Sequence, residues 1–393
     1  MTVRPSNAER RQQRAIDDHL TRVALEARSL VERVRPLNLD ARASRIAALR
    51  RRERLPPLAH GEPGHVSDDA WRSLEEGRRL AREGVMAAAY DARFGELELE
   101  LRMVEAVGSP ALADLSLKRF DVGPPLVERA GAMLSALTNA SDEPEDLLRA
   151  PAVAQLFRDL AEGAELRVSV RIEPSMTSLA AAGERTVYLS DRPLPRREAL
   201  RIAVHELLGH LTSSANSRLH RFDLPRAGSA GSLRDQEGLA LQLEAESGLL
   251  SAPRLRRVLG RTVAVQMLRE GANFSECALA LHDRHGLPED DAVDVATRAY
   301  RGGGFARDAI YLRGWQRVRR ALIHERSALD WLRLGRFSVD DVGALGGLLD
   351  AGWLSPARYK PSLSRSLSAT GPGTSSETLP PSLAASLMIL DET

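Results

Sequence analysis

The string HELLGH, residues 205–210, brings two histidines and a glutamate together within six consecutive positions. A mostly apolar run, residues 200–204, precedes it, so the string falls in a predicted helix. Imidazoles are common zinc ligands, and a carboxylate beside the metal can serve as a general base. The string therefore predicts half of a zinc site, with His205 and His210 as ligands and Glu206 as the base.

The two histidines are five residues apart, one more than in the familiar zinc-protease signature. On a regular α-helix, residues four apart differ by about 40° around the axis, whereas residues five apart differ by about 140°. Both imidazoles can meet one metal if the helix is widened by a π-type turn, or if it bends near Gly209. The spacing therefore predicts a local distortion of the kind found mostly at functional sites.

A third ligand is available in the next helical pattern, which begins at Asp235. Asp235 is a candidate N-cap, and Glu237 in the first turn would complete a His2Glu zinc set with an open fourth position. His220, Glu244 and Glu246 are competing ligands. Glu244 has a second possible role, as the acceptor for the other ring N–H of a ligand histidine.

The order HELLGH and then QEGLA, residues 236–240, resembles the HExxxH-plus-QEGLA metallopeptidase family. That family includes the microtubule-associated tyrosine carboxypeptidases of animals and bacterial proteins named for a flavohemoglobin expression-modulating QEGLA motif. The resemblance extends in pieces from about Leu97 to Tyr359, through residues 109–116, 298–303 and 305–314. It implies one Zn²⁺ per chain, held by His205, His210 and Glu237, with Glu206 as the catalytic carboxylate.

The expected activity is that of a zinc-dependent, carboxypeptidase-like peptidase acting on the C-terminus of a peptide or protein. Water activated by the metal would attack the scissile carbonyl, and Glu206 would take its proton and pass it to the leaving amine. Tyr311 is the candidate donor to the developing oxyanion, although a tyrosine simply packed on a helix would fit the pattern as well. Arg301 is the candidate group for the substrate carboxylate, with Arg298 and Arg313 as alternatives.

Two other functions fit the same motifs. A metal-containing regulatory or binding protein would keep the ligands without peptidase activity. A zinc hydrolase acting on a non-peptide amide would share the ligands and the base.

Composition narrows the class of protein. The chain has 393 residues, 43% of them hydrophobic, and a formal net charge of +1, which argues against a general nucleic-acid binder. The single cysteine, Cys277, excludes an internal disulfide and favours a reducing cytoplasm. No apolar run approaches the roughly 20 residues of a membrane span, and the first residues lack the apolar core of a signal peptide. We therefore expect a cytoplasmic protein without a membrane segment.

The pattern along the chain predicts an α+β, predominantly helical fold. Residues 1–60 form an expected arginine-rich helical extension, and residues 61–360 an expected zinc metallopeptidase-like catalytic domain. Strict alternation over 166–172 and again over 185–190 predicts two strands, and thus a zincin-like small sheet beside the metal-binding helix. Residues 361–393, rich in Ser, Thr, Pro and Gly, are expected to form a disordered tail.

Overall fold

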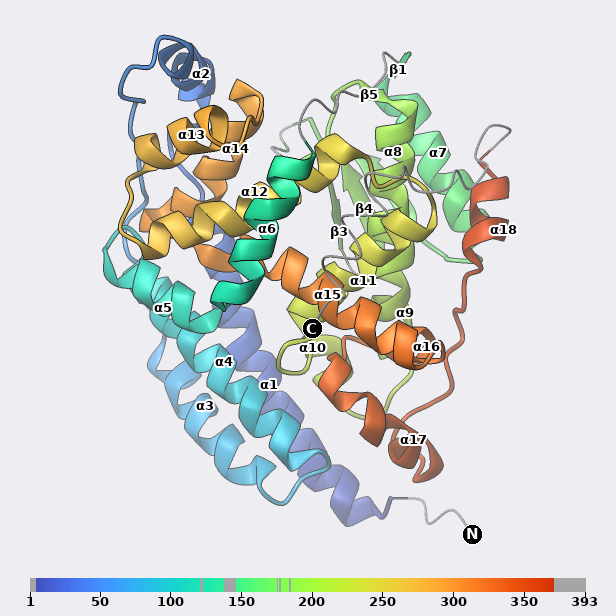
Figure 1. Ribbon diagram of the computed structural model, residues 1–393. Helices are drawn as coiled ribbons and strands as arrows, with labels where there is room; N and C mark the ends of the chain where they lie inside the picture. The colour runs from blue at the N-terminus through green and yellow to red at the C-terminus, as the bar shows by residue number, and fades with distance from the viewer. Residues whose placement is uncertain are drawn as a thin grey trace. The chain divides into compact units, whose positions relative to one another are not determined.

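The computed structural model describes residues 5–120, 123–137, 146–174, 176, 178–183 and 185–370. The chain divides into two compact units, each assembled from segments far apart in sequence. Unit 1 contains Met1–Arg11, Asp142–Ser251 and Gly314–Pro380, and unit 2 contains Gln12–Ser141, Ala252–Arg313 and Pro381–Thr393. Helices predominate and the sheets are small, which confirms the predicted α+β, mainly helical class (Figure 1).

Unit 1 combines helices with the strands (Figure 1). Its strands are β1 (Leu147–Leu148), β2 (Ser169–Ile172), β3 (Ala180–Ala182), β4 (Thr186–Leu189) and β5 (Leu194–Pro195). Its first helices are α7 (Ala150–Gly163), α8 (Arg196–Ala203), η2 (Val204–Leu211), α9 (Thr212–Ser217), α10 (Leu224–Ala227) and α11 (Ser232–Glu246). Its later ones are α15 (Ile310–His324, in this unit from Gly314), α16 (Ala328–Leu332), η5 (Val339–Asp341), α17 (Val342–Asp350) and α18 (Leu363–Ser368).

A three-stranded sheet of unit 1 has the order β2-β4-β3. Strand β2 runs parallel to β4, and β3 runs antiparallel to it, so β2 and β3 are the edge strands. Two strands of the sheet, β2 and β4, coincide with the predicted pair. Val187 and Leu189 of β4 are buried while Tyr188 is 37% exposed, as the alternation of a half-covered sheet requires.

The core of unit 1 joins this sheet to the helices that follow it. One face of α7 contributes Val153, Phe157 and Leu160, and β4 contributes its two buried side chains. Apolar residues of α8 and η2, including Leu207 and Leu208, complete the cluster. The segment that carries HELLGH is therefore fixed by a hydrophobic core on its apolar side.

The described part of unit 2 contains helices joined by loops and no strand. Its N-terminal helices are α1 (Asn7–Arg33, in this unit from Gln12), η1 (Leu39–Ala41), α2 (Arg42–Arg50), α3 (Asp68–Ala81), α4 (Ala87–Ala106), α5 (Ala111–Arg119) and α6 (Pro124–Ala136). Its second segment contains α12 (Ala252–Arg269), α13 (Phe274–Asp283), α14 (Glu289–Tyr300), η3 (Arg301–Gly303) and η4 (Ala306–Ala309). Within this unit, Arg42 of α2 pairs with Asp294 of α14 at 2.6 Å.

The C-terminal segment is described as far as residue 370. The expected disordered tail, 361–393, begins with the short helix α18, whose N-cap Ser362 accepts a hydrogen bond from the N–H of Arg365. Residues 371–393 lie outside the described part. None of the helices described is both long enough and apolar enough to cross a lipid bilayer.

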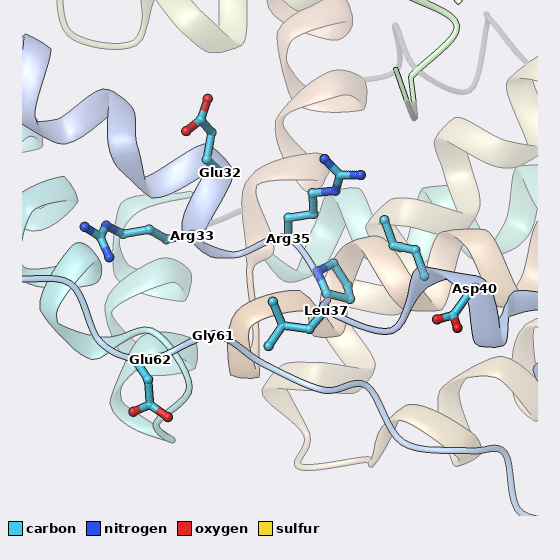
Figure 2. A pocket seen from close by; sticks show the side chains of 9 residues that line it. Glu32, Arg33, Arg35, Leu37, Asp40, Gly61 and Glu62 are labelled. Carbon is cyan, nitrogen blue, oxygen red and sulfur yellow. The ribbon is translucent and has the colours of Figure 1, made fainter. Parts of the chain in front are cut away.

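Unit 2 also contains an open cleft of about 640 Å³ near the end of α1 (Figure 2). Exposed side chains of both charges line it, among them Glu32, Arg33, Arg35 and Asp40. The lining thus contains the acidic Glu32, Asp40 and Glu62 and the basic Arg33 and Arg35.

Candidate metal centre

The helix that carries the two histidines contains the distortion that their spacing predicts. Segments α8, η2 and α9 follow one another without interruption, and η2 is π-helical from Val204 to Leu211. At its end, the N–H of Thr212 donates to the carbonyl of Leu207, five residues earlier. Because π-type hydrogen bonding joins residues five apart, it brings His205 and His210 onto the same side of the helix.

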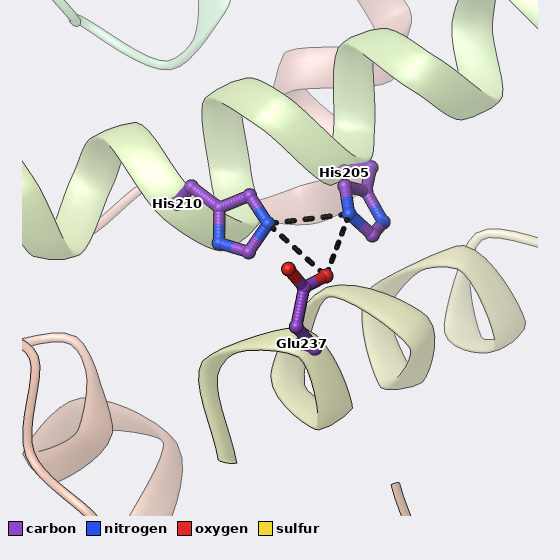
Figure 3. A group of neighbouring side chains, drawn as sticks. All are labelled: His205, His210 and Glu237. Carbon is purple, nitrogen blue, oxygen red and sulfur yellow. Dashed lines mark hydrogen bonds and ion pairs between the residues drawn. The ribbon is translucent and has the colours of Figure 1, made fainter. Parts of the chain in front are cut away.

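Three side chains converge on one point (Figure 3). The Nε2 atoms of His205 and His210 are 3.2 Å apart. Glu237 Oε2, from the neighbouring helix α11, lies 3.4 Å from His205 Nε2 and 3.6 Å from His210 Nε2. The three side chains thus form a group that could hold a metal ion.

The dimensions of this triangle fit a transition metal. Zinc bonded to nitrogen and oxygen at about 2.0–2.1 Å in a tetrahedron places its ligand atoms about 3.3 Å apart. Glu237 Oε2 is buried and has no hydrogen-bond partner in the part of the chain that the structure describes. Since an unpaired buried carboxylate oxygen is costly, a cation at this point would satisfy it. The His210 side chain is 23% exposed, which leaves a side of the group open to solvent.

Hydrogen bonds behind the group fix the orientation of His205. Its Nδ1–H donates to Glu244 Oε1 at 2.7 Å, which leaves the lone pair of Nε2 facing the other ligands. Arg201 Nη1 donates to the same Glu244 oxygen at 2.9 Å, and Arg201 is in turn held by Glu198. Glu244 is therefore the acceptor for the histidine N–H, one of the two roles that the sequence leaves open for it.

The charges of the group are strongly coupled when no metal is bound. Burial lowers the pKa of His205, but the interactions of its ring with the carboxylates of Glu237 and Glu244 outweigh it and raise the pKa to about 9. Burial likewise raises the pKa of Glu237, yet the two imidazoles outweigh it and hold that pKa well below its ordinary value. A cation that binds must displace the proton from His205, so binding releases a proton at neutral pH.

Glu206 lies on the same π-helical segment and contacts the sheet. Its Oε2 accepts a hydrogen bond from the backbone N–H of Ala182 in β3 at 3.0 Å. This bond fixes the carboxylate beside the edge strand and next in sequence to His205. The predicted contact between a small sheet and the histidine-bearing helix is therefore present, and it is made through Glu206.

Small residues let α11 approach η2 closely. A Cβ added at Gly209 would lie 2.7 Å from Ala240 Cβ and 3.1 Å from Ala240 Cα. Gly209 belongs to HELLGH and Ala240 to QEGLA, so the two motifs pack against each other directly. This close approach sets the distance between Glu237 and the imidazoles.

Gly238, the glycine of QEGLA, likewise allows a close approach, here between α11 and α15. A Cβ at Gly238 would lie 2.1 Å from the carbonyl carbon of Gly314 in α15, which is too close for any side chain. Gln236 donates through Nε2 to the carbonyl of Leu332 at 3.2 Å. These contacts fix the rotation of α11 about its axis, and with it the direction in which Glu237 points.

The start of α11 differs from the prediction. The helix begins at Ser232, so Asp235 is not its N-cap and Glu237 lies beyond the first turn. The Asp235 carboxylate is buried and accepts hydrogen bonds from Arg234, Arg317 and the backbone N–H of Val339. Two of these partners, Arg317 and Val339, are distant in sequence, and they satisfy a carboxylate that otherwise favours a helix terminus.

We expect Gly209→Ala to weaken metal binding and to lower the free energy of unfolding by about 1–3 kcal/mol, the usual cost of overpacking. The added methyl would push η2 away from Ala240 and separate the imidazoles from Glu237. Gly347→Ala is the matched control, because a Cβ there meets nothing within 4 Å. Thermal unfolding and zinc titration of both variants measure the effect; equal behaviour of the two would contradict this packing argument.

The other candidate ligands of the sequence lie in different surroundings. His220 Nε2 donates to the carbonyl of Leu334 at 2.7 Å, and its Nδ1 accepts from the N–H of Ser355 at 3.1 Å. Glu246 accepts from Gln242 at 3.0 Å. His220 and Glu246 therefore have hydrogen-bond partners of their own and do not belong to the convergent group.

The remaining candidates, Tyr311, Arg298, Arg301 and Arg313, belong to unit 2. Arg298 donates to both carboxylate oxygens of Asp308, and Arg301 Nη2 lies 3.6 Å from Asp308 Oδ1. The Tyr311 ring lies under a further arginine, with the guanidinium carbon of Arg261 4.8 Å from its centre. No sequence pattern marks Asp308 or Arg261, because a single acid and one more arginine give no signal in so arginine-rich a chain.

Comparison with known proteins adds one finding. The family model described as microtubule-associated tyrosine carboxypeptidase matches residues 53–374. No curated protein and no solved structure matches the chain significantly. The matched range contains both motifs of the metal centre and the Arg298–Tyr311 segment.

Proposed function

The chain belongs to the microtubule-associated tyrosine carboxypeptidase family, and we propose that it is a zinc-dependent carboxypeptidase. Its substrate would be the C-terminus of a peptide or protein. The convergence of His205, His210 and Glu237 beside Glu206 is the observation that carries this proposal. We propose the cytoplasm as its compartment, since its single cysteine is a buried free thiol.

His205, His210 and Glu237 would hold one Zn²⁺, which supplies a Lewis acid for the substrate carbonyl and acidifies a water molecule. Glu206 would receive the proton of the attacking water and return it to the leaving amine. The Ala182 N–H keeps the Glu206 carboxylate in place during both transfers. A base next to the metal ligands has no use in a purely structural site, which favours catalysis.

Edge strand β3 is the proposed support for the substrate backbone. Gly183 donates to Thr186, and Ser190 of the neighbouring segment donates to Leu179, so residues 179 and 183 face β4. By the alternation of an antiparallel pair, Ala180 and Ala182 direct their backbone groups away from β4. One of these groups, the Ala182 N–H, holds Glu206. An extended peptide that added to this edge would therefore pass beside the catalytic carboxylate.

Tyr311 remains the proposed donor to the carbonyl oxygen of the substrate. Arg301 remains the proposed group for the substrate carboxylate, with Arg298 and Arg313 beside it in sequence. Unit 1 supplies the proposed metal group and the base.

The test is to incubate the zinc-loaded, tag-free protein with a library of peptides and to identify the products by mass spectrometry. We expect single C-terminal amino acids to appear, and we expect a chelator or amidation of the peptide C-terminus to prevent it. Internal fragments would indicate an endopeptidase instead. A protein with stoichiometric zinc that releases no product from peptides would refute the proposal and favour a metal-containing regulatory protein.

A further inference from the structure

Arginine side chains of this protein repeatedly bind carboxylates through one edge of the guanidinium. The edge consists of Nε and Nη2, whose N–H groups point the same way and match the two oxygens of a carboxylate. The arginines that use both atoms in this way are Arg42 on Asp294, Arg79 on Glu76, Arg201 on Glu198, Arg234 on Asp235 and Arg298 on Asp308. The Nε–Nη2 edge is therefore the side on which these arginines bind an anion.

Arg333, which follows α16 in unit 1, differs from these arginines. Its Nε and Nη2 are both buried without a hydrogen-bond partner among the described residues, and no other arginine in that part of the chain has both atoms in this state. Its Nη1 donates to the carbonyl of Pro361 at 3.2 Å. The residue is 4% exposed, so the edge is shielded from bulk solvent. Arg333 thus presents its anion-binding edge inside unit 1.

The acidic side chains that act on Arg333 are engaged elsewhere. Burial lowers the pKa of Arg333 to about 10, and the attraction of Asp330 and Glu246 opposes this decrease only in part. Asp330 Oδ2 lies 3.7 Å from Nζ of Lys360, and Glu246 accepts a hydrogen bond from Gln242. The guanidinium is still charged at neutral pH, because its pKa stays well above 7. A buried cation of this kind is costly unless an anion accompanies it.

We propose that the Nε–Nη2 edge of Arg333 is a binding site for a small anion with one negative charge. One charge balances the guanidinium, and the two N–H directions suit a halide ion or the two oxygens of a small carboxylate such as formate. An exposure of 4% excludes a peptide or a nucleotide phosphate as the ligand, because either would need an open approach to the edge. The ligand is therefore an ion of a few atoms at most.

The backbone beside Arg333 holds the helices of the metal group. The carbonyl of Leu332, the preceding residue, accepts from Ser213 Oγ of α9 at 3.3 Å and from Gln236 Nε2 of α11 at 3.2 Å. Asn216 of α9 donates through Nδ2 to the carbonyl of Arg333 itself at 2.9 Å. An anion that fixes the Arg333 side chain would therefore stabilise the contacts that this segment makes with both helices. It would also favour zinc binding, a link that depends on the proposed metal centre.

The test compares the melting temperatures of the unaltered protein and of Arg333→Gln at constant ionic strength, while chloride, bromide, formate or acetate replaces the larger anion isethionate. We expect a halide or a small carboxylate to raise the melting temperature of the unaltered protein by several degrees and then to saturate, as binding to the folded state requires. Arg333→Gln should lack this response. In isethionate alone it should melt no lower than the unaltered protein, because it has no unbalanced buried charge. Arg158→Gln, which removes an exposed arginine of α7, is the matched control and should keep the response.

A response of equal size in Arg333→Gln, or one that never saturates, would overturn the inference in favour of a general salt effect. A second measurement needs no variant: crystals of the unaltered protein soaked in bromide or formate should show the ion beside Nε and Nη2 of Arg333, and neither ion at that position would also overturn it. The ion that is found there decides between a halide and a carboxylate. Neither measurement uses peptidase activity, so a protein that binds the anion but hydrolyses no peptide would refute the proposed function alone.

Discussion

Glu206→Gln should reduce the rate of peptide hydrolysis by about a hundredfold to ten-thousandfold, the usual contribution of a general base. Glutamine keeps the shape and can still accept the hydrogen bond from the Ala182 N–H, but it cannot take a proton at neutral pH. The metal content should stay stoichiometric, because the ligand atoms of His205, His210 and Glu237 are unchanged. Steady-state kinetics combined with zinc analysis of the same sample measures both quantities.

Glu162→Gln is the control for this experiment, since Glu162 is an exposed glutamate of α7 in the same unit. It should leave the rate of hydrolysis unchanged. Full activity of the Glu206→Gln protein would exclude Glu206 as the base. It would also remove the argument that a base beside the metal ligands favours a catalytic site over a structural one.

Glu237→Gln should produce a protein that no longer retains zinc during dialysis. The substitution replaces the anionic oxygen that lies 3.4 Å and 3.6 Å from the two imidazole nitrogens with a neutral amide. It also removes a negative charge that helps to raise the pKa of His205. Two neutral imidazoles alone are a weaker site, because the usual catalytic set has three protein ligands.

Glu246→Gln is the matched control, because Glu246 ends the same helix but contacts Gln242 rather than the metal group. We expect that variant to keep one zinc per chain by elemental analysis. Zinc retained at full stoichiometry by the Glu237→Gln protein would mean that the third ligand is a different residue.

The sequence predicted the local geometry of the histidine-bearing helix, because that geometry depends on short spacings. The separation of five positions from His205 to His210 predicted either a π-type turn or a bend near Gly209, and η2 is π-helical. The alternation over residues 185–190 predicted a strand, and β4 is present there. Glu237 could be singled out because its carboxylate follows the histidines on a second helix, although the start of that helix was misplaced at Asp235.

Strand β3 shows what the local pattern could not predict. Its three residues are alanines, which have a low preference for strands, so no signal marked them. They pair because β4 lies beside them, and Ala182 is held in addition by the Glu206 carboxylate from a segment 24 residues away. The local pattern was also insufficient for the family-like segments 298–303 and 305–314. Their arginines were visible in the sequence, but Asp308, which organises them, was not.

By itself, the sequence determined the residues that could bind a metal, the helical distortion that two of them require and the mainly helical class. The tertiary structure decided which glutamate joins the histidines, since that choice depends on how closely two helices approach. The contacts of Gly209 with Ala240 and of Gly238 with Gly314 set that approach, because neither glycine has room for a side chain. Periodicity records which face of a helix is apolar, whereas a metal site depends on distances between helices, and those are fixed by packing.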